Sequence, residues 1–560
     1  MKWWSPPKQR QRWGEAQILP SDNWGQIFFD LFYVGGAYNL GNVIKTSDIG
    51  MKCILYFCAA GFPCMMMWYD KMYFDARFTT RPGHDVFHRF LNIIQICCVA
   101  SALSRIRSVE VLSHPCTHID MFQFSLSLFL HSIVTIARYI EVMKFVIGDP
   151  SARVAAKKDI SWRIVPTLLL LAAAVESGVS YYTNHEGDEN CPTYENPIWY
   201  CLASWLSWVA IGYCEIVLFA PKRLCIDTTV PLNVHFCMHR YGEWFMLMFG
   251  ESIMSLVIVE GNNESFHHSI KFYSGVLSVI FMAHLHFQSQ PHHNEDHALT
   301  RSRHSNYLYT VLVPIYSMAL ISTGICYKMF LYDYKMSRSG AEGNYGRTLR
   351  DSDYGREYNS SDYAEKKRQF TADLFSGSIT IVLICTDIMI LLHQGIHAVW
   401  NQTRAIPRAR LALIVISKYC LIFVLAVMSA FQNDPHFMAT FGLGAIFFQQ
   451  VLRHYFHGWQ RQVNHADDDS SMDSNTAAGI GFTENSSTVD EDCNYRYEIQ
   501  SFEDAKQAFA KFEQQLMVEA KEHKQQRRQL PTHNNDVDDS RTLRNEIEDT
   551  KDFGYSYYAC

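Results

Sequence analysis

Apolar runs long enough to cross a membrane recur along the chain from residue 24 to residue 456. Each run is about 18 to 25 residues long, and a helix of about 20 residues crosses the roughly 30 Å of hydrocarbon in a bilayer. Hydrocarbon offers the backbone no water to bond with, so a helix, which satisfies its own N–H and C=O groups, is the expected structure. The sequence therefore predicts an all-α polytopic membrane protein with about twelve transmembrane helices. We expect these helices at 24–44, 53–69, 86–104, 121–143, 163–183, 198–219, 239–259, 269–290, 306–332, 370–395, 411–431 and 437–456.

Polar residues are concentrated outside these runs, so whole-chain averages hide the membrane character. Hydrophobic residues make up 48% of the chain, and its mean hydropathy is only -0.09. Residues 333–368 and 461–560 have mixed charge and too little apolar surface to form a core, so we expect a disordered extracytoplasmic loop and a largely disordered cytoplasmic tail. Apolar residues at 3,4 spacing predict one amphipathic helix within the tail, at about 498–529. The predicted domains are an arm at 1–23, a membrane domain at 24–460 and the tail.

Charges in the short loops predict the orientation of the protein. Most loop Lys and Arg residues fall on one side of the predicted membrane, which places both termini in the cytoplasm, at the plasma membrane or an endomembrane. Asn263 and Asn359 begin N-x-S/T sequences on the opposite side, where glycosylation is chemically possible. The net charge of -7 comes largely from the tail and argues against nucleic-acid binding, so the lipid bilayer is the expected partner.

The first and seventh runs share a pattern, because each begins with aromatic residues and contains a carboxylate. This pattern suggests two six-helix halves. Internal repeats are the usual architecture of transporters, whose binding sites lie at the interface between the repeats.

Charged side chains inside the apolar runs are the strongest functional signal. Asp30 lies about two turns into the first run, and Arg240, Glu243 and Glu251 lie in the seventh. A charge at the centre of a bilayer costs at least roughly 2.5 kcal/mol, so such residues mark an ion or solute pathway by default. A structural ion-pair network that fixes helix packing is the alternative. The candidate pathway residues are Asp30, Arg138, Glu176, Arg240, Glu243, Glu251, Asp387 and Lys418.

Asp387 and Lys418 are predicted to form an ion pair. A short connection separates their two runs, which makes the helices antiparallel and adjacent. Counted from the helix ends near Gly395 and Leu411, both charges lie at a depth of about 11 Å. Because neither charge could stay ionised alone in lipid, pairing is the simplest reason for having both.

A metal site and an enzyme active site have little support in the sequence. His235, His239 and Glu243 are spaced i, i+4 and i+8, so one helix face could present two imidazoles and a carboxylate to a metal. Histidine commonly lies at helix ends, however, and no metal is assigned to these weak candidates. The chain has no Walker A loop, dinucleotide-binding glycine pattern, nucleophile elbow or HExxH sequence, so we predict neither enzyme activity nor a cofactor.

Three short motifs contain the charged residues, namely Phe28-Phe29-Asp30-Leu31, Arg240-Tyr241-Gly242 and Phe249-Gly250-Glu251-Ser252. They resemble the bacterial low temperature requirement A family, whose first helix reads Glu-Leu-Phe-Phe-Asp-Leu and whose later helix reads Glu-Arg-Phe-Gly, followed by Leu-Gly-Glu-Ser. Residues 68–78 and 88–95 also look like that family, and the likeness covers roughly residues 20–460. Gln26 and His239 replace the acids that lead two of the family motifs, so no role that needs those acids is carried over. The resemblance implies a multi-pass membrane protein and no particular activity.

A transporter of a small solute or ion is the function that these observations favour. An ion channel is the first alternative, because a two-repeat bundle whose first helix carries Asp30 among aromatic residues could line a pore. A non-transporting scaffold or sensor is the second, acting through the C-terminal tail. In that case the tail helix would bind a protein partner or a second copy of the chain.

Overall fold

The computed structural model covers the helical part of the chain and a short N-terminal segment. Contacts divide the chain into two compact units, Met1–Ser471 and Met472–Cys560, and the helices below lie almost wholly in the first. The residues that the structure describes are 3–10, 24–46, 50–79, 86–106, 119–146, 151–183, 196–216, 230–258, 266–291, 296–339, 360–395 and 408–475.

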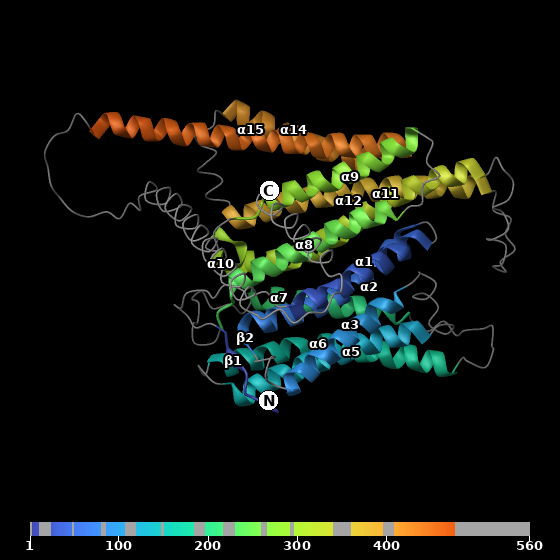
Figure 1. The fold of residues 1–560 in the computed structure, drawn as a ribbon, viewed down its shortest axis with the longest axis vertical. Helices are drawn as coiled ribbons and strands as arrows, with labels where there is room; N and C mark the ends of the chain where they lie inside the picture. Colours follow the sequence, from blue (N-terminus) through green and yellow to red (C-terminus); the bar gives the residue numbers. More distant parts are fainter. Residues whose placement is uncertain are drawn as a thin grey trace, which may run out of the picture. The chain divides into compact units, whose positions relative to one another are not determined.

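Helices make up nearly all of the described chain (Figure 1). Each predicted span overlaps one of them. Two short strands, β1 (Lys8–Gln9) and β2 (Phe78–Thr79), complete the structure. The helices are α1 (Trp24–Thr46), α2 (Met51–Arg77), α3 (Val86–Arg105), α5 (Ile119–Phe145), α6 (Ser151–Thr183), α7 (Ile198–Cys214), α8 (Val234–Val257), α9 (Phe266–Phe287), α10 (Ala298–Arg301), α11 (Arg303–Ser339), α12 (Ser360–Gln394), α14 (Arg408–Met428) and α15 (Pro435–Asn475).

Length and composition identify the helices that can cross a bilayer, and they make this chain a polytopic membrane protein. Two shorter apolar helices, Ile198–Cys214 and Leu413–Met428, accompany the long ones. α1, which carries Asp30, and α8, which carries Arg240, Glu243 and Glu251, are not among the helices that are long and apolar enough. A total of twelve crossings therefore stays a prediction. Among the described helices, seven are long and apolar enough: Met51–Arg77, Val86–Arg105, Ile119–Phe145, Ser151–Thr183, Phe266–Phe287, Arg303–Tyr332 and Ala364–Gln394.

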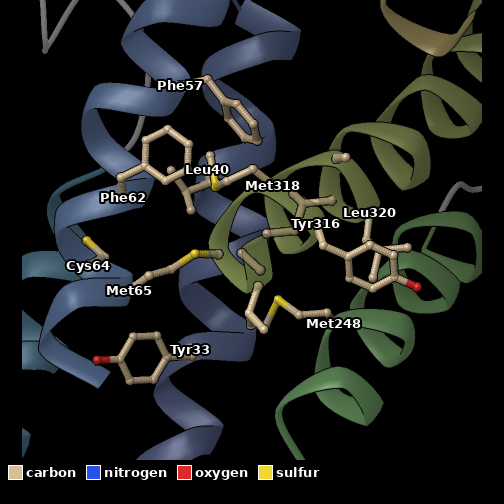
Figure 2. Packing of buried hydrophobic residues seen from close by; sticks show 14 of the residues in the cluster. Tyr33, Leu40, Phe57, Phe62, Cys64, Met65, Met248, Tyr316, Met318 and Leu320 are labelled. Carbon is tan, nitrogen blue, oxygen red and sulfur yellow. The ribbon is translucent and has the colours of Figure 1, made fainter. Parts of the chain in front are cut away.

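α1 joins the helices on either side of it into one core. It contacts α2 and α3 as well as α8 and α11, and Figure 1 shows it between these two groups. Figure 2 shows buried side chains of the four helices pointing toward one another, among them Leu40 of α1, Met65 of α2, Met248 of α8 and Met318 of α11. The apolar centre of the protein therefore lies where α1, α2, α8 and α11 meet.

The N-terminal arm is attached to the bundle, which the sequence did not predict. β1 pairs antiparallel with β2 directly after α2, with Lys8 opposite Thr79. The N–H of Arg10 donates to the carbonyl of Arg77 at 2.8 Å, and the Arg10 guanidinium lies 4.4 Å from the centre of the Phe236 ring. This end of the bundle is called the arm end below.

Helices occupy parts of two segments that were predicted to be disordered. α11 continues to Ser339 and α12 starts at Ser360, so helix occupies both ends of the predicted 333–368 loop. α15 continues to Asn475, well beyond the predicted start of the tail at 461. Once a helix exists, each added residue gains a hydrogen bond, so helices extend past their apolar part into polar sequence. Residues 340–359 and 476–560 lie outside the described residues, and so do the amphipathic helix expected at 498–529 and the glycosylation candidates Asn263 and Asn359.

The close approach of α8 and α11 yields a prediction about Gly324. A Cβ atom at Gly324 would lie 2.9 Å from the Cα of Ser252 on α8, whereas a Cβ at Gly35 on α1 would have no atom within 4 Å. We expect Gly324→Ala to lower stability by about 1 to 3 kcal/mol, because a backbone atom cannot move aside as a side chain can. Gly35→Ala should leave stability unchanged or raise it, since Ala favours a helix over Gly by about 1 kcal/mol. Thermal unfolding of the purified variants measures both, and equal melting temperatures would contradict the close approach.

Candidate functional site

Asp30 lies at the centre of a buried hydrogen-bonded group formed by three helices. Its Oδ1 accepts from Nη2 of Arg240 on α8 at 2.7 Å and from Nε1 of Trp68 on α2 at 2.9 Å. Arg240 donates through Nη1 to Oε2 of Glu243, also at 2.7 Å. Asp30 and Arg240 are only 2% and 4% exposed, so this is an ion pair removed from solvent. The structure thus brings together three of the predicted pathway residues.

The start of α8 places Arg240 opposite Asp30. Asn233 caps this helix, because its side chain accepts from the N–H of Phe236 at 2.9 Å. The N–H of Asn233 also donates to the carbonyl of Ala76 near the end of α2, at 3.3 Å. Around the ion pair, the Trp68 ring packs on Trp244 with centroids 4.6 Å apart. The cap and the ring contact fix α8 against α2 at the level of the charges.

Three further charges on α2 belong to the same region, and sequence reasoning missed them as site residues. Arg163 of α6 donates to Oδ1 of Asp70 from Nε at 3.1 Å and from Nη2 at 2.7 Å. Lys71 donates to Oδ2 of Asp75 at 2.7 Å. The predicted span ended at residue 69, which assigned these residues to a loop, whereas α2 continues to Arg77. The signal for a longer helix was present, because large apolar residues separate Lys71 from Asp75.

Arg138 of α5 is also buried, but its hydrogen-bond partners are neutral. Its Nη1 donates to Oε1 of Gln95 at 2.9 Å and its Nη2 to Oδ1 of Asn92 at 2.6 Å. The guanidinium lies 4.8 Å from the centre of the Phe74 ring. Arg138 therefore belongs to a second cluster, between α3 and α5, and does not bond to the Asp30 group.

The N-terminal arm covers the arm end of this second cluster. Trp4 donates through Nε1 to Oε1 of Glu141. His88 Nε2 lies 3.0 Å from the carbonyl of Ser5, to which it donates, and 3.5 Å from the Glu141 carboxylate. The N–H of Phe87 donates to the carbonyl of Trp3 at 3.1 Å. These contacts join the arm to α3 and α5.

Several buried polar atoms in this region have no hydrogen-bond partner among the described residues. They include both ring nitrogens of His131, Oδ2 of Asp30, the hydroxyls of Tyr33 and Tyr69, and Oε2 of Glu141. Nearly all buried polar groups in proteins bond to protein or to ordered water. The described chain does not supply the hydrogen bonds of these atoms.

The remaining predicted pathway residues lie elsewhere. Glu176 is half-buried on α6, roughly 20 Å along the helix from Arg163. Glu251 is buried on α8 and accepts from Oγ of Ser255 at 3.2 Å, but it lies about 16 Å along that helix from Arg240. The eight candidates therefore do not form one continuous site.

Asp387 and Lys418 form the ion pair that their depths predict. Lys418 of α14 donates to Oδ1 of Asp387 on α12, and the side chains are 29% and 12% exposed. Gln449 of α15 donates to the carbonyl of Lys418 at 3.2 Å. The pair joins α12 to α14, far along the chain from the Asp30 group.

The weak metal candidates do not assemble into a site. His239 is exposed, with its Nδ1 3.5 Å from Oε1 of Glu243, and His235 is half-buried. In the described part of the chain, no group of three or more His, Cys, Asp or Glu residues is arranged to hold a metal ion.

A buried histidine pair consists of His297, which caps the start of α10, and His393, which lies in the last turn of α12. His297 accepts through Nδ1 from the N–H of Leu299 at 3.2 Å, and His393 accepts through Nδ1 from the N–H of Ala298 at 3.0 Å. The two rings lie 4.5 Å apart. Burial, together with His393, lowers the pKa of His297 to about 2, so the ring is neutral in the folded protein and can accept this bond.

A comparison with protein families found a match to most of the membrane domain. A family model described as bacterial low temperature requirement A protein (LtrA) matches residues 24–341, which include Asp30, Arg240 and Glu251. No curated protein and no solved structure matches the chain.

The lowered pKa of His297 predicts an acid-sensitive fold. In the unfolded chain His297 has a pKa near 6.5 and binds a proton that it does not bind in the folded protein. The contribution of the neutral His297 to stability is therefore complete above about pH 6.5 and is lost as the pH falls. His297 should lower the free energy of unfolding by at most about 1.4 kcal/mol for each unit by which the pH falls. Melting temperatures between pH 7 and pH 5 should fall less for His297→Asn than for the unmodified protein. The exposed His304 is the control, and a His297→Asn profile parallel to that of His304→Asn would contradict the prediction.

The Asp387 and Lys418 pair predicts non-additive effects on stability. Asp387→Ala should destabilise the protein by stranding the lysine, and adding Lys418→Ala should restore part of the loss. The coupling energy should be roughly 0.5 to 3 kcal/mol, as for other residues in direct contact. Thermal unfolding of both single variants and the double variant measures it. Asp387→Ala combined with Lys144→Ala, which removes a lysine at the end of α5, should be additive, and equal coupling in the two cycles would disprove the pair's contribution.

Proposed function

The chain belongs to the bacterial low temperature requirement A family, and from its buried charges we propose that it is a transporter of a small cation, protons included. Its pathway runs through the interior between α1, α2, α5 and α8. The charge bias of the loops supports an orientation with both termini in the cytoplasm.

The second oxygen of Asp30 is the observation that carries this proposal. Oδ1 is bonded to Arg240 and Trp68, whereas Oδ2 is buried without a hydrogen-bond partner among the described residues. A buried carboxylate oxygen with a free lone pair attracts a proton or a small cation, because leaving it unmet costs free energy. The group therefore both holds its helices together and retains binding capacity.

Charged groups extend from Asp30 toward the arm end. Lys71 is close enough to both Arg240 and Arg138 for electrostatic interaction, and Asp75 interacts with Arg138 in the same way. Beyond Arg138, Glu141 presents another buried oxygen without a partner in the described chain. A series of such groups at short intervals is the arrangement that proton and cation pathways in membranes use.

The exchange Asp30→Asn tests this proposal. Asn keeps an oxygen that can accept from Arg240 and Trp68 but loses the negative charge that attracts a cation. We expect cation or proton flux into proteoliposomes to fall by at least about tenfold, because a charge-assisted interaction is removed. The flux is measured with a pH-sensitive dye for protons and with radioactive tracers for Na⁺ and K⁺.

Phe28→Leu is the matched control, because Phe28 lies two residues away on α1 and is 54% exposed. It should transport normally. A folded Asp30→Asn variant with full flux would leave the buried ion pair a purely structural element. Saturable counterflow supports a transporter, whereas single-channel currents in a planar bilayer would replace the transporter by a channel.

A further inference from the structure

A recess at the end of the bundle opposite the arm has the composition of an anion site. Its enclosed cavity volume is about 10 Å³, room for about one water molecule, so a larger ligand would be held in its open mouth. Lys328 lies 18 residues beyond Thr310, which bonds to Tyr73 of α2 near the arm end, so the recess is about 27 Å further along α11. The recess is lined by Tyr38, Gly41, Asn42 and Lys45 of α1, Ser255 of α8, and Ile325, Lys328 and Met329 of α11.

Two like charges line this recess without a carboxylate between them. Lys328 is only 5% exposed, and Lys45 is close enough to repel it. Their ammonium groups lie over aromatic rings, Lys328 at 4.5 Å from the centre of Tyr38 and Lys45 at 4.3 Å from that of Tyr332. In the described chain neither ammonium forms an ion pair, and no acidic residue lines the recess. A buried ammonium in such surroundings is stabilised when an anion binds beside it.

The surrounding charges reinforce this preference. Lys367 of α12 donates to the carbonyl of Lys45 at 3.2 Å, which brings a third ammonium to the rim. Glu251 attracts Lys328, but it lies behind Ser255, whose hydroxyl bonds to it. The recess also offers a hydroxyl and an amide as neutral hydrogen-bond groups.

We propose that this recess binds a phosphate-type oxyanion between Lys45 and Lys328. An oxyanion accepts several hydrogen bonds at once, which suits two ammonium groups beside Ser255 and Asn42. Lys45 lies in the last turn of α1, where a dissolved phosphate and the phosphate of a lipid headgroup could both reach it. The proposal concerns a site separate from the Asp30 pathway, and its failure leaves the proposed transport unaffected.

Binding of inorganic phosphate to the full chain in phosphatidylcholine nanodiscs tests the proposal. Calorimetric titration should detect binding that weakens by about tenfold or more in Lys328→Gln and in Lys45→Gln, because each removes one charge-assisted contact. Lys52→Gln is the matched control, since Lys52 also lies near an aromatic ring, at 5.7 Å from the centre of Tyr56, but does not line the recess. It should bind as the unmodified protein does. If the buried Lys328 is needed for folding, the half-buried Lys45 decides the test.

Nanodiscs that contain phosphatidylglycerol identify the source of the phosphate group. If a lipid headgroup is the ligand, phosphatidylglycerol abolishes phosphate binding and co-purifies with the unmodified protein but not with Lys45→Gln. If the free anion is the ligand, phosphate binding persists in these nanodiscs. Either result supports the site. It is overturned if neither phosphate nor phosphatidylglycerol binds, or if both lysine variants bind as tightly as Lys52→Gln.

Discussion

The ion pair between Asp30 and Arg240 is the constraint on which the arrangement of the helices depends. Neither charge could remain ionised alone in hydrocarbon, so the two must meet. They are 210 positions apart in the chain, and their 2.7 Å contact holds the first helix against α8. Trp68 donates to the same oxygen and thereby fixes α2 in the same place. The apolar core of α1, α2, α8 and α11 packs around this junction.

The charges near α2 form several buried ion pairs. A buried ion pair is often no more stable than apolar side chains of similar volume, because desolvation offsets the attraction. The contact of Arg163 with Asp70 and that of Lys71 with Asp75 nevertheless lie close to the Asp30 group. Buried polar atoms that have no hydrogen-bond partner among the described residues lie in the same region, among them Oδ2 of Asp30 and the hydroxyl of Tyr69.

The two ends of the bundle differ in chemistry. At the arm end, β1 pairs with β2 and Trp4 donates to Glu141. The arm therefore bonds both to the backbone after α2 and to an acidic side chain of α5. At the opposite end Lys45 and Lys328 face a recess that no acidic residue of the described chain lines. The buried charges near Asp30 are therefore paired, whereas Lys45 and Lys328, at the far end of α1 and α11, form no ion pair within the described chain.

The sequence by itself determined the class of the protein and the approximate positions of its helices, because apolar runs of about 20 residues cross hydrocarbon as helices that satisfy their own backbone hydrogen bonds. It also predicted the pairing of Asp387 with Lys418, since their helices are neighbours and their depths follow from counting residues. Only the tertiary structure decided that Asp30 joins Arg240 and Trp68, that α2 carries Asp70 and Asp75 into the interior, and that Arg138 binds neutral amides instead. The contact of Asp30 with Arg240 joins helices distant in the chain, and helical periodicity fixes the face of a residue without fixing which helix packs against it.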